Sequence, residues 1–171
     1  GQEFGNGVAD VLLGKVSPSG KLTDTIAKIE DYPFSKYMNN PDYSEYAEDI
    51  YVGYRYFNTF NKDKIIYPFG YGLSYSNFDI KCIDVKYNGT LVSVKLSVKN
   101  LGNYNGKEVA QIYLSKPQGK LGNPNVELIW YKKTNELKPN EEEIIEANID
   151  LSLHASYDDT NITGYINSFV L

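Results

Sequence analysis

The strictest constraint on the fold of this chain is an alternation of apolar and polar residues between residues 92 and 99. Every second residue there is valine or leucine, and the residues between them are serine or lysine. A period of two buries one side of a β-strand in a core and leaves the other side in water. The Asn88-Gly89 pair just before it is typical of a tight hairpin turn. The pattern therefore predicts a half-buried strand that follows a hairpin turn.

Further strands are predicted at residues 108–115, 126–133 and 143–151, with turn-forming residues between them. Several short strands at this spacing, without a helical pattern between them, indicate an antiparallel β-sandwich of about 100 residues. The single tryptophan, Trp130, is predicted to join its core rather than to stack on carbohydrate. The apolar run 169–171 is interpreted as a sign that a terminal strand has been cut away. Alternation within the strands predicts the other core residues: Val92, Val94, Leu96, Val98, Ile112, Leu114, Ile145, Ala147 and Ile149.

The beginning of the chain has a different pattern. Apolar residues three and four positions apart in residues 1–14 predict a short helix that ends at Gly14. Residues 21–26 predict a short strand. Because a single helix and a single strand cannot bury their apolar sides alone, this segment is interpreted as the end of an α/β unit.

Residues 30–77 are rich in tyrosine, glycine and proline. The segment is too long for an ordinary connection and too aromatic for a disordered linker. The chain has 16 tyrosines in all, and a tyrosine can bury its ring while its hydroxyl keeps a polar partner. We therefore expect this connector to lie against a surface that belongs in part to a missing domain. Part of Tyr32–Tyr56 is expected to be mobile or to pack against a neighbouring molecule instead.

Charge and residue counts exclude several classes of protein. The 22 acidic residues exceed the 17 basic ones, and no segment gathers cations into a patch for phosphates, so nucleic acid is not an expected partner. No apolar run approaches the roughly 20 residues that cross a bilayer, so we expect a soluble protein without a membrane partner. One histidine, His154, and one cysteine, Cys82, exclude a multi-histidine metal site and an internal disulfide. No metal or cofactor is expected. His154 is predicted to have a structural role or to lie at the surface. Cys82 is predicted to pack as a small apolar residue.

Two sets of sequence blocks resemble a known family. The first set resembles the C-terminal half of glycoside hydrolase family 3, the β-glucosidase and β-xylosidase group: residues 5–14 (GNGVADVLLG), 18–22 (PSGKL), 51–57 (YVGYRYF) and 67–75 (YPFGYGLSY). The second set resembles the fibronectin type III-like domain of that family: residues 98–102, 106–113 and 137–141. Together the blocks cover nearly the whole chain.

The resemblance implies three parts. Residues 1–29 would be the C-terminal piece of an α/β sandwich domain, residues 30–77 an irregular connector, and residues 78–171 a fibronectin type III-like β-sandwich. The fold class is therefore expected to be mainly β. Residues 155–159 and 163–165 resemble members in which the domain order is reversed, so the order stays open.

The resemblance also implies a function. The family's nucleophile, an Asp, belongs to a (β/α)8 barrel that this chain lacks, and its acid/base Glu lies upstream of the first block. We therefore expect no catalytic residue here and a chain that is inactive by itself. It would be the non-catalytic, domain-stabilising C-terminal part of a retaining β-glucosidase, with the missing barrel as its partner and carbohydrate bound only by the intact enzyme. A homo-oligomer stays open, and a cytoplasmic location is favoured over secretion.

An alternative function is a free-standing fibronectin-like module that binds carbohydrate or protein. Among the candidate residues, Glu3 at the start of the first helix is a weak candidate for substrate binding, although an acid there also complements the helix dipole. Arg55 is expected to pair with an acid and pin the connector rather than clamp a sugar. We expect four connector residues to form an interdomain strap: Tyr54, Arg55, Phe69 and Tyr71. Adjacent carboxyls are interpreted as solvated and non-catalytic at three places: Glu48-Asp49, Glu141-Glu142 and Asp158-Asp159.

Overall fold

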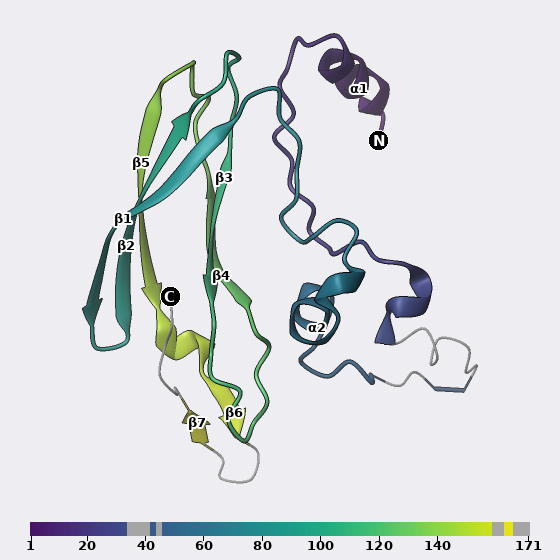
Figure 1. Ribbon diagram of the computed structural model, residues 1–171, viewed down its shortest axis with the longest axis vertical. Helices are drawn as coiled ribbons and strands as arrows, with labels where there is room; N and C mark the ends of the chain where they lie inside the picture. The colour runs from purple at the N-terminus through teal and green to yellow at the C-terminus, as the bar shows by residue number, and fades with distance from the viewer. Residues whose placement is uncertain (34–41, 44–45, 159–162, 166–171) are drawn as a thin grey trace. The chain divides into compact units, whose positions relative to one another are not determined.

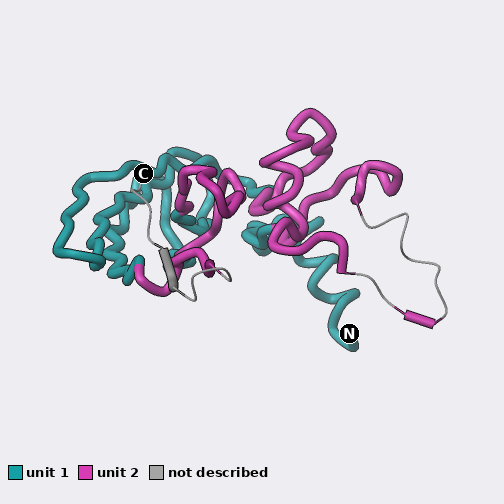
Figure 2. The backbone as a smooth tube through the Cα atoms, turned by 90° about the horizontal axis from the view of Figure 1, so that it is seen from below, with its two compact units in different colours: residues 1–21, 72–112, 130–151 teal, residues 22–71, 113–129, 152–171 magenta. Residues whose placement is uncertain are grey.

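The computed structural model describes residues 1–33, 42–43, 46–158 and 163–165. The chain forms two compact units, each assembled from segments far apart in sequence (Figure 2). The first unit contains residues 1–21, 72–112 and 130–151, and the second contains residues 22–71, 113–129 and 152–171. Within the described residues, no helix is long and apolar enough to span a membrane.

The predicted first helix is confirmed as α1, Phe4–Leu12 (Figure 1). It ends before Gly14, whose φ of 70° lies in the left-handed region that glycine adopts without strain. None of its nine residues is buried, and Leu12 is 76% exposed. The strand predicted over residues 21–26 is wrong, because only Ile26 forms a bridge, with Tyr67. Leu22 also exchanges backbone hydrogen bonds with Gly70 and Tyr71, but two separate points of contact do not make a strand.

The connector contains one α-helix that the sequence did not predict, α2, Tyr54–Phe60. Gly53 precedes it with a φ of 57°, and Asn61 ends it. A seven-residue helix between two such residues is too short to show a periodic pattern. Phe57 is its buried residue, with no exposed surface. Three short 3₁₀ helices complete the helical structure described: η1, Ile29–Asp31; η3, Lys62–Lys64; and η4, Leu151–His154.

Antiparallel strands make up most of the remaining regular structure (Figure 1). One sheet has the order β1-β2-β5, with β1 at Phe78–Asn88, β2 at Leu91–Asn100 and β5 at Glu142–Asp150. A second sheet pairs β3, Val109–Leu114, with β4, Glu127–Lys133, and a third pairs β6, Ser156–Asp158, with β7, Thr163–Tyr165. The hairpin between β1 and β2 turns at Gly89, as predicted. The mainly β, fibronectin-like fold is confirmed, with strand ends within one residue of the predicted ones for β3, β4 and β5.

The predicted core is confirmed at all nine alternating positions, each of which is at most 8% exposed. They lie on β2, β3 and β5. Two other packing predictions are wrong. Trp130, on β4, is only half-buried and does not belong to the buried core. Cys82, on β1, is exposed. Residues 169–171 lie outside the described residues.

A buried polar residue, Asn100, closes the end of β2 in the first unit. It has no exposed surface, and all its side-chain bonding groups are used. Its Oδ1 accepts hydrogen bonds from the Ser76 hydroxyl at 2.6 Å and the Gly102 N–H at 2.9 Å. Its Nδ2 donates to the carbonyls of Tyr104 at 2.8 Å and Leu137 at 2.9 Å. One side chain therefore links four loop positions around the core.

We expect Asn100→Ala to lower the free energy of unfolding of this chain by about 3 kcal/mol, because it leaves buried donors and acceptors without partners. Urea unfolding followed by circular dichroism measures the change. Asn148→Ala is the matched control. Asn148 is exposed and accepts one hydrogen bond, from Ser93, so its loss should cost less than about 0.5 kcal/mol. Equal effects of the two substitutions would contradict the role given to Asn100.

Candidate functional site

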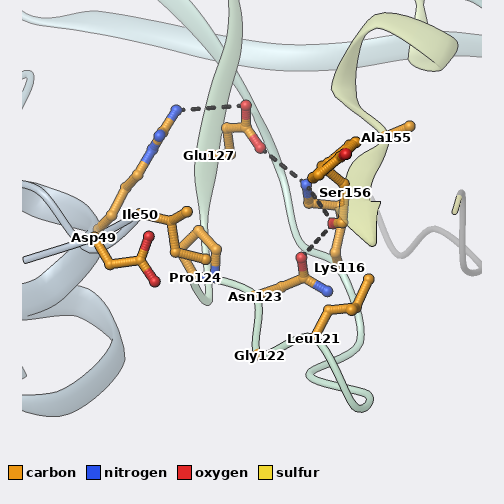
Figure 3. Close-up of a pocket in the computed structure, with 12 residues that line it drawn as sticks. Asp49, Ile50, Lys116, Leu121, Gly122, Asn123, Pro124, Glu127, Ala155 and Ser156 are labelled. Atoms are coloured by element: carbon orange, nitrogen blue, oxygen red, sulfur yellow. Dashed lines mark hydrogen bonds and ion pairs between the residues drawn. The ribbon is translucent and has the colours of Figure 1, made fainter. Parts of the chain in front are cut away.

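A hollow in the second unit has a volume of about 430 Å³ (Figure 3). Three segments far apart in sequence line it. The connector contributes Asp49, Ile50 and Arg55, and the β3–β4 region contributes Lys116, Leu121, Gly122, Asn123, Pro124 and Glu127. The segment that contains β6 contributes Ala155, Ser156 and Tyr157.

Glu127, the first residue of β4, lies among three basic side chains. Its Oε2 is 3.2 Å from the Lys116 Nζ. Its Oε1 is 3.4 Å from the Arg55 Nη2 and 3.4 Å from the His154 Nδ1. The side chains of Glu127 and Lys116 are only 16% and 10% exposed. The cluster is therefore partly shielded from water. Charge pairs in such a shielded environment are stronger than those at the exposed surface.

The surroundings of Glu127 favour its ionised form. Burial alone would raise the pKa of this carboxyl, but the charge and hydrogen bond of Lys116 oppose burial, together with His154 and Arg55. The result is a pKa of Glu127 below its usual value. Glu127 is thus held as a carboxylate, and it is poorly suited to donate a proton as a general acid.

Lys116 also has structural partners besides Glu127. Its Nζ donates to the His154 carbonyl at 3.0 Å and lies 3.3 Å from the Ser156 Oγ. Ser156 in turn donates to the Asn123 Oδ1, as Figure 3 shows. Because an ammonium group has three donors, these contacts together with Glu127 use its full capacity. The hollow is therefore built around a connected network that ties the β3–β4 region to the segment after η4.

Helix α2 is held to the same region by hydrogen bonds. The Tyr54 hydroxyl accepts a bond of 2.8 Å from the Leu128 N–H. The Asn125 N–H donates to the Thr59 Oγ1 at 3.0 Å, and the Asn125 Nδ2 donates to the Asn58 carbonyl at 3.0 Å. With the Arg55–Glu127 pair, these contacts join α2 to residues 125–128 at four points.

Aromatic rings extend this contact. The Tyr54 ring lies 4.4 Å from that of Phe69 and 6.4 Å from that of Tyr113. Burial, and to a lesser degree Tyr54, raise the pKa of the Tyr113 hydroxyl. Tyr71 has a different environment, because its ring lies 5.1 Å from Tyr67 and is 37% exposed. Of the four strap residues, three therefore meet at one cluster and Tyr71 lies apart from it.

Of the other candidate residues, Asp49 lines the hollow, whereas Glu3, Glu141 and Glu142 do not. Glu3 is exposed at the start of α1 and accepts a hydrogen bond of 2.6 Å from the Asn6 amide. Glu141 accepts from the Lys138 N–H, and Glu142 accepts from the Ser97 hydroxyl. The expectation that the adjacent carboxyls are solvated is wrong for Asp158, which is 6% exposed; Asp159 lies outside the described residues.

Two central residues of the cluster, Glu127 and Lys116, were missed from the sequence. Each stands alone among strand or turn residues, and 72 positions separate Arg55 from Glu127. The only sequence signal was Arg55 itself, which predicted an acidic partner without identifying it. Within the described residues, no group of three or more His, Cys, Asp or Glu side chains could hold a metal ion.

Comparison with known families decides the identity of the fold. Residues 1–75 match the model described as "Glycosyl hydrolase family 3 C-terminal domain", and residues 108–163 match "Fibronectin type III-like domain". The chain belongs to the C-terminal region of glycosyl hydrolase family 3. The predicted family resemblance is thereby confirmed.

Relatives of this family 3 chain are much longer proteins. It is 51% identical over 166 residues to a β-glucosidase of Ruminococcus albus, covering 96% of the chain and 17% of the relative. It is 44% identical to β-glucosidase A of Butyrivibrio fibrisolvens, covering 93% and 21%. A solved β-glucosidase structure from Paenibacillus barengoltzii superposes with a TM-score of 0.87 at 48% identity, covering 91% and 17%. The chain thus spans about a fifth of the length of such proteins.

Proposed function

We propose that the protein containing these residues is a retaining β-glucosidase that hydrolyses terminal β-linked glucose, and that this chain is its non-catalytic, domain-stabilising part. The relatives support the first half of the proposal, since those at 51% and 44% identity are named β-glucosidases. A solved relative, β-glucosidase 3B of Thermotoga neapolitana, is described in complex with glucose. The expected partner of the chain is a catalytic barrel domain elsewhere in the same protein.

The ionic cluster around Glu127 supports the proposal that this chain is non-catalytic and stabilises the domain structure. A retaining glycosidase uses two carboxyl groups about 5 to 5.5 Å apart, one of which has a raised pKa so that it can donate a proton. Glu127 is the carboxyl most surrounded by cations in the described hollow, and its pKa is lowered. Glu127 therefore serves as an anion that holds neighbouring segments together, because its carboxylate oxygens already contact Lys116, Arg55 and His154.

The connector is proposed to act as a strap that holds structural segments together. The contacts of α2 with residues 125–128 support this role, because each joins side chain to backbone or charge to charge. The alternative of a carbohydrate-binding module has weaker support. Trp130 and Tyr131 are neighbours on one strand, so their side chains point to opposite sides and do not form a stacking platform.

Substitution of strap residues in the intact enzyme tests this proposal. We expect Phe69→Ala to lower its stability by about 2 kcal/mol, because the half-buried ring packs on Tyr54. Tyr71→Ala should cost less than about 1 kcal/mol, since Tyr71 is more exposed. Neither substitution should change the Michaelis constant for a β-glucoside more than about twofold. A large rise in that constant with unchanged stability would instead place the strap at the sugar site.

A further inference from the structure

Three asparagines in this chain are followed directly by glycine: Asn6, Asn88 and Asn105. In such a pair the backbone nitrogen of the glycine can attack the side-chain Cγ of the asparagine, since glycine has no Cβ to hinder the approach. The new C–N bond closes a succinimide ring, and the side-chain nitrogen leaves as ammonia with the proton of the attacking nitrogen. Water then opens the ring at either carbonyl. The product is an aspartyl or isoaspartyl residue, which adds one negative charge.

The fold controls this reaction at the glycine nitrogen. A glycine N–H that donates a hydrogen bond must first be released, and the free energy of that local opening slows the attack. The backbone also needs space to rotate, so that the nitrogen can meet the Cγ atom. The three pairs share one dipeptide, but they differ in both of these respects.

The pair Asn105-Gly106 is the most restricted. The Gly106 N–H donates to the Leu137 carbonyl at 3.1 Å, and the Leu137 N–H donates back to the Gly106 carbonyl at 2.8 Å. Gly106 is buried, and a Cβ atom there would lie 3.0 Å from the Phe78 Cζ. Attack on Asn105 therefore requires opening of a packed part of the first unit.

The pair Asn6-Gly7 is held only by helix α1. The Gly7 N–H donates to the Glu3 carbonyl at 3.0 Å, and the Asn6 Nδ2 donates to the Glu3 carboxylate at 2.6 Å. None of the nine residues of α1 is buried. Because a short helix without tertiary packing is only marginally stable, these bonds should protect Asn6 less than the core protects Asn105.

The pair Asn88-Gly89 lies at the hairpin between β1 and β2 (Figure 1). Asn88 pairs with Leu91, so Gly89 and Thr90 form a two-residue loop. Among the residues that the structure describes, neither the Gly89 N–H nor the Asn88 side chain has a hydrogen-bond partner. Both residues are exposed, and only chain neighbours lie within 4 Å of the Cβ position of Gly89. The glycine nitrogen is therefore free to attack, and the turn has space to rotate.

We propose that Asn88 is the site at which this chain modifies itself, through a succinimide formed with Gly89. Water is the only co-reactant. The reaction places a negative charge at the hairpin, and its isoaspartyl product lengthens the backbone by one carbon before the turn that fixes the register of β1 against β2. The proposal concerns the chemistry of the hairpin and does not rest on the proposed function.

The three pairs test the proposal within one molecule. The chain is incubated in mildly alkaline buffer, and conversion of each asparagine is followed by peptide mass spectrometry. We expect Asn88 to react at least about tenfold faster than Asn105, with Asn6 between them. In urea the three rates should fall within about threefold of one another, because unfolding removes the protecting hydrogen bonds. A folded chain in which Asn6 or Asn105 reacted as fast as Asn88 would overturn the proposal, and so would the same tenfold difference in urea.

Asn88→Gln is the matched variant, because glutamine keeps the amide but closes only a less favoured six-membered ring. Since Asn88 is exposed, the substitution should shift the melting temperature by less than about 2 °C. Anion exchange separates the modified chain by its added charge, and Asn88→Asp serves as the standard for the aspartyl product. The first acidic form of the wild type should be absent from Asn88→Gln. Its appearance there at the wild-type rate would place the modification elsewhere and refute the assignment.

Discussion

Replacing Glu127 with glutamine should lower the free energy of unfolding of this chain by about 2 to 3 kcal/mol. The substitution removes the anion from between Lys116 and Arg55, and the side chain of Lys116 is only 10% exposed. A buried charge that loses its partner costs far more than an exposed one, because water cannot replace the lost interaction. Urea unfolding measures the global change, and hydrogen exchange at the Leu128 amide, which donates to Tyr54, measures release of α2.

Glu146→Gln is the matched control for this experiment. Glu146 pairs with Lys95 at 3.1 Å, but its side chain is 69% exposed. Exposed pairs of this kind contribute about 0 to 1 kcal/mol, so the control should unfold nearly as the wild type does. If both variants lost the same stability, the cluster around Glu127 would have no special role in holding the connector.

The pH dependence of stability gives an independent check. The pKa of Glu127 is lower in the folded chain than its ordinary value of 4.5. The unfolded state therefore binds the proton more tightly, and the stabilisation is complete above that value and is lost as the pH falls below it toward the folded pKa. We expect Glu127→Gln to remove this part of the acid destabilisation, so that the stability difference between variant and wild type narrows below pH 4.5.

This chain alone should hydrolyse no chromogenic β-glucoside, β-xyloside or β-N-acetylglucosaminide above the rate in buffer. The retaining mechanism requires a nucleophile and a proton donor in fixed geometry. Of the two carboxyl residues that line the described hollow, Asp49 and Glu127, Glu127 is already engaged by Lys116, Arg55 and His154. Loss of the barrel should therefore remove the full catalytic acceleration rather than a fraction of it.

The longer protein, assayed in the same buffers, is the positive control for this prediction. Turnover by the chain that disappeared when Glu127, Glu3 or Asp158 was replaced by its amide would contradict the non-catalytic assignment. If turnover persisted in all three variants, size-exclusion chromatography would identify its source. Activity that eluted separately from the chain would come from a contaminant.

Most of the β-structure could be predicted from sequence because its signal is local. The alternation from Val92 to Val98 indicates which side of β2 faces the core. The same rule predicted that Ile145, Ala147 and Ile149 on β5 are buried. The short strand expected at residues 21–26 did not form, because a strand needs a continuous ladder of hydrogen bonds. Here the segment bonds to the backbone of residues 66–71 at two separate points, Leu22 and Ile26. Helix α2 was not predicted, because seven residues are too few to show a helical period.

The sequence by itself determined the family, the mainly β fold and the nine alternating core positions, because blocks of adjacent residues and a period of two carry that information. Only the tertiary structure decided which charges meet at Glu127, since Arg55, Lys116 and His154 approach it from separate segments. It also decided that Cys82 is exposed although its neighbours across the sheet are buried. Burial depends on whether another strand covers a side chain, and no local pattern in β1 specifies the number of strands opposite it.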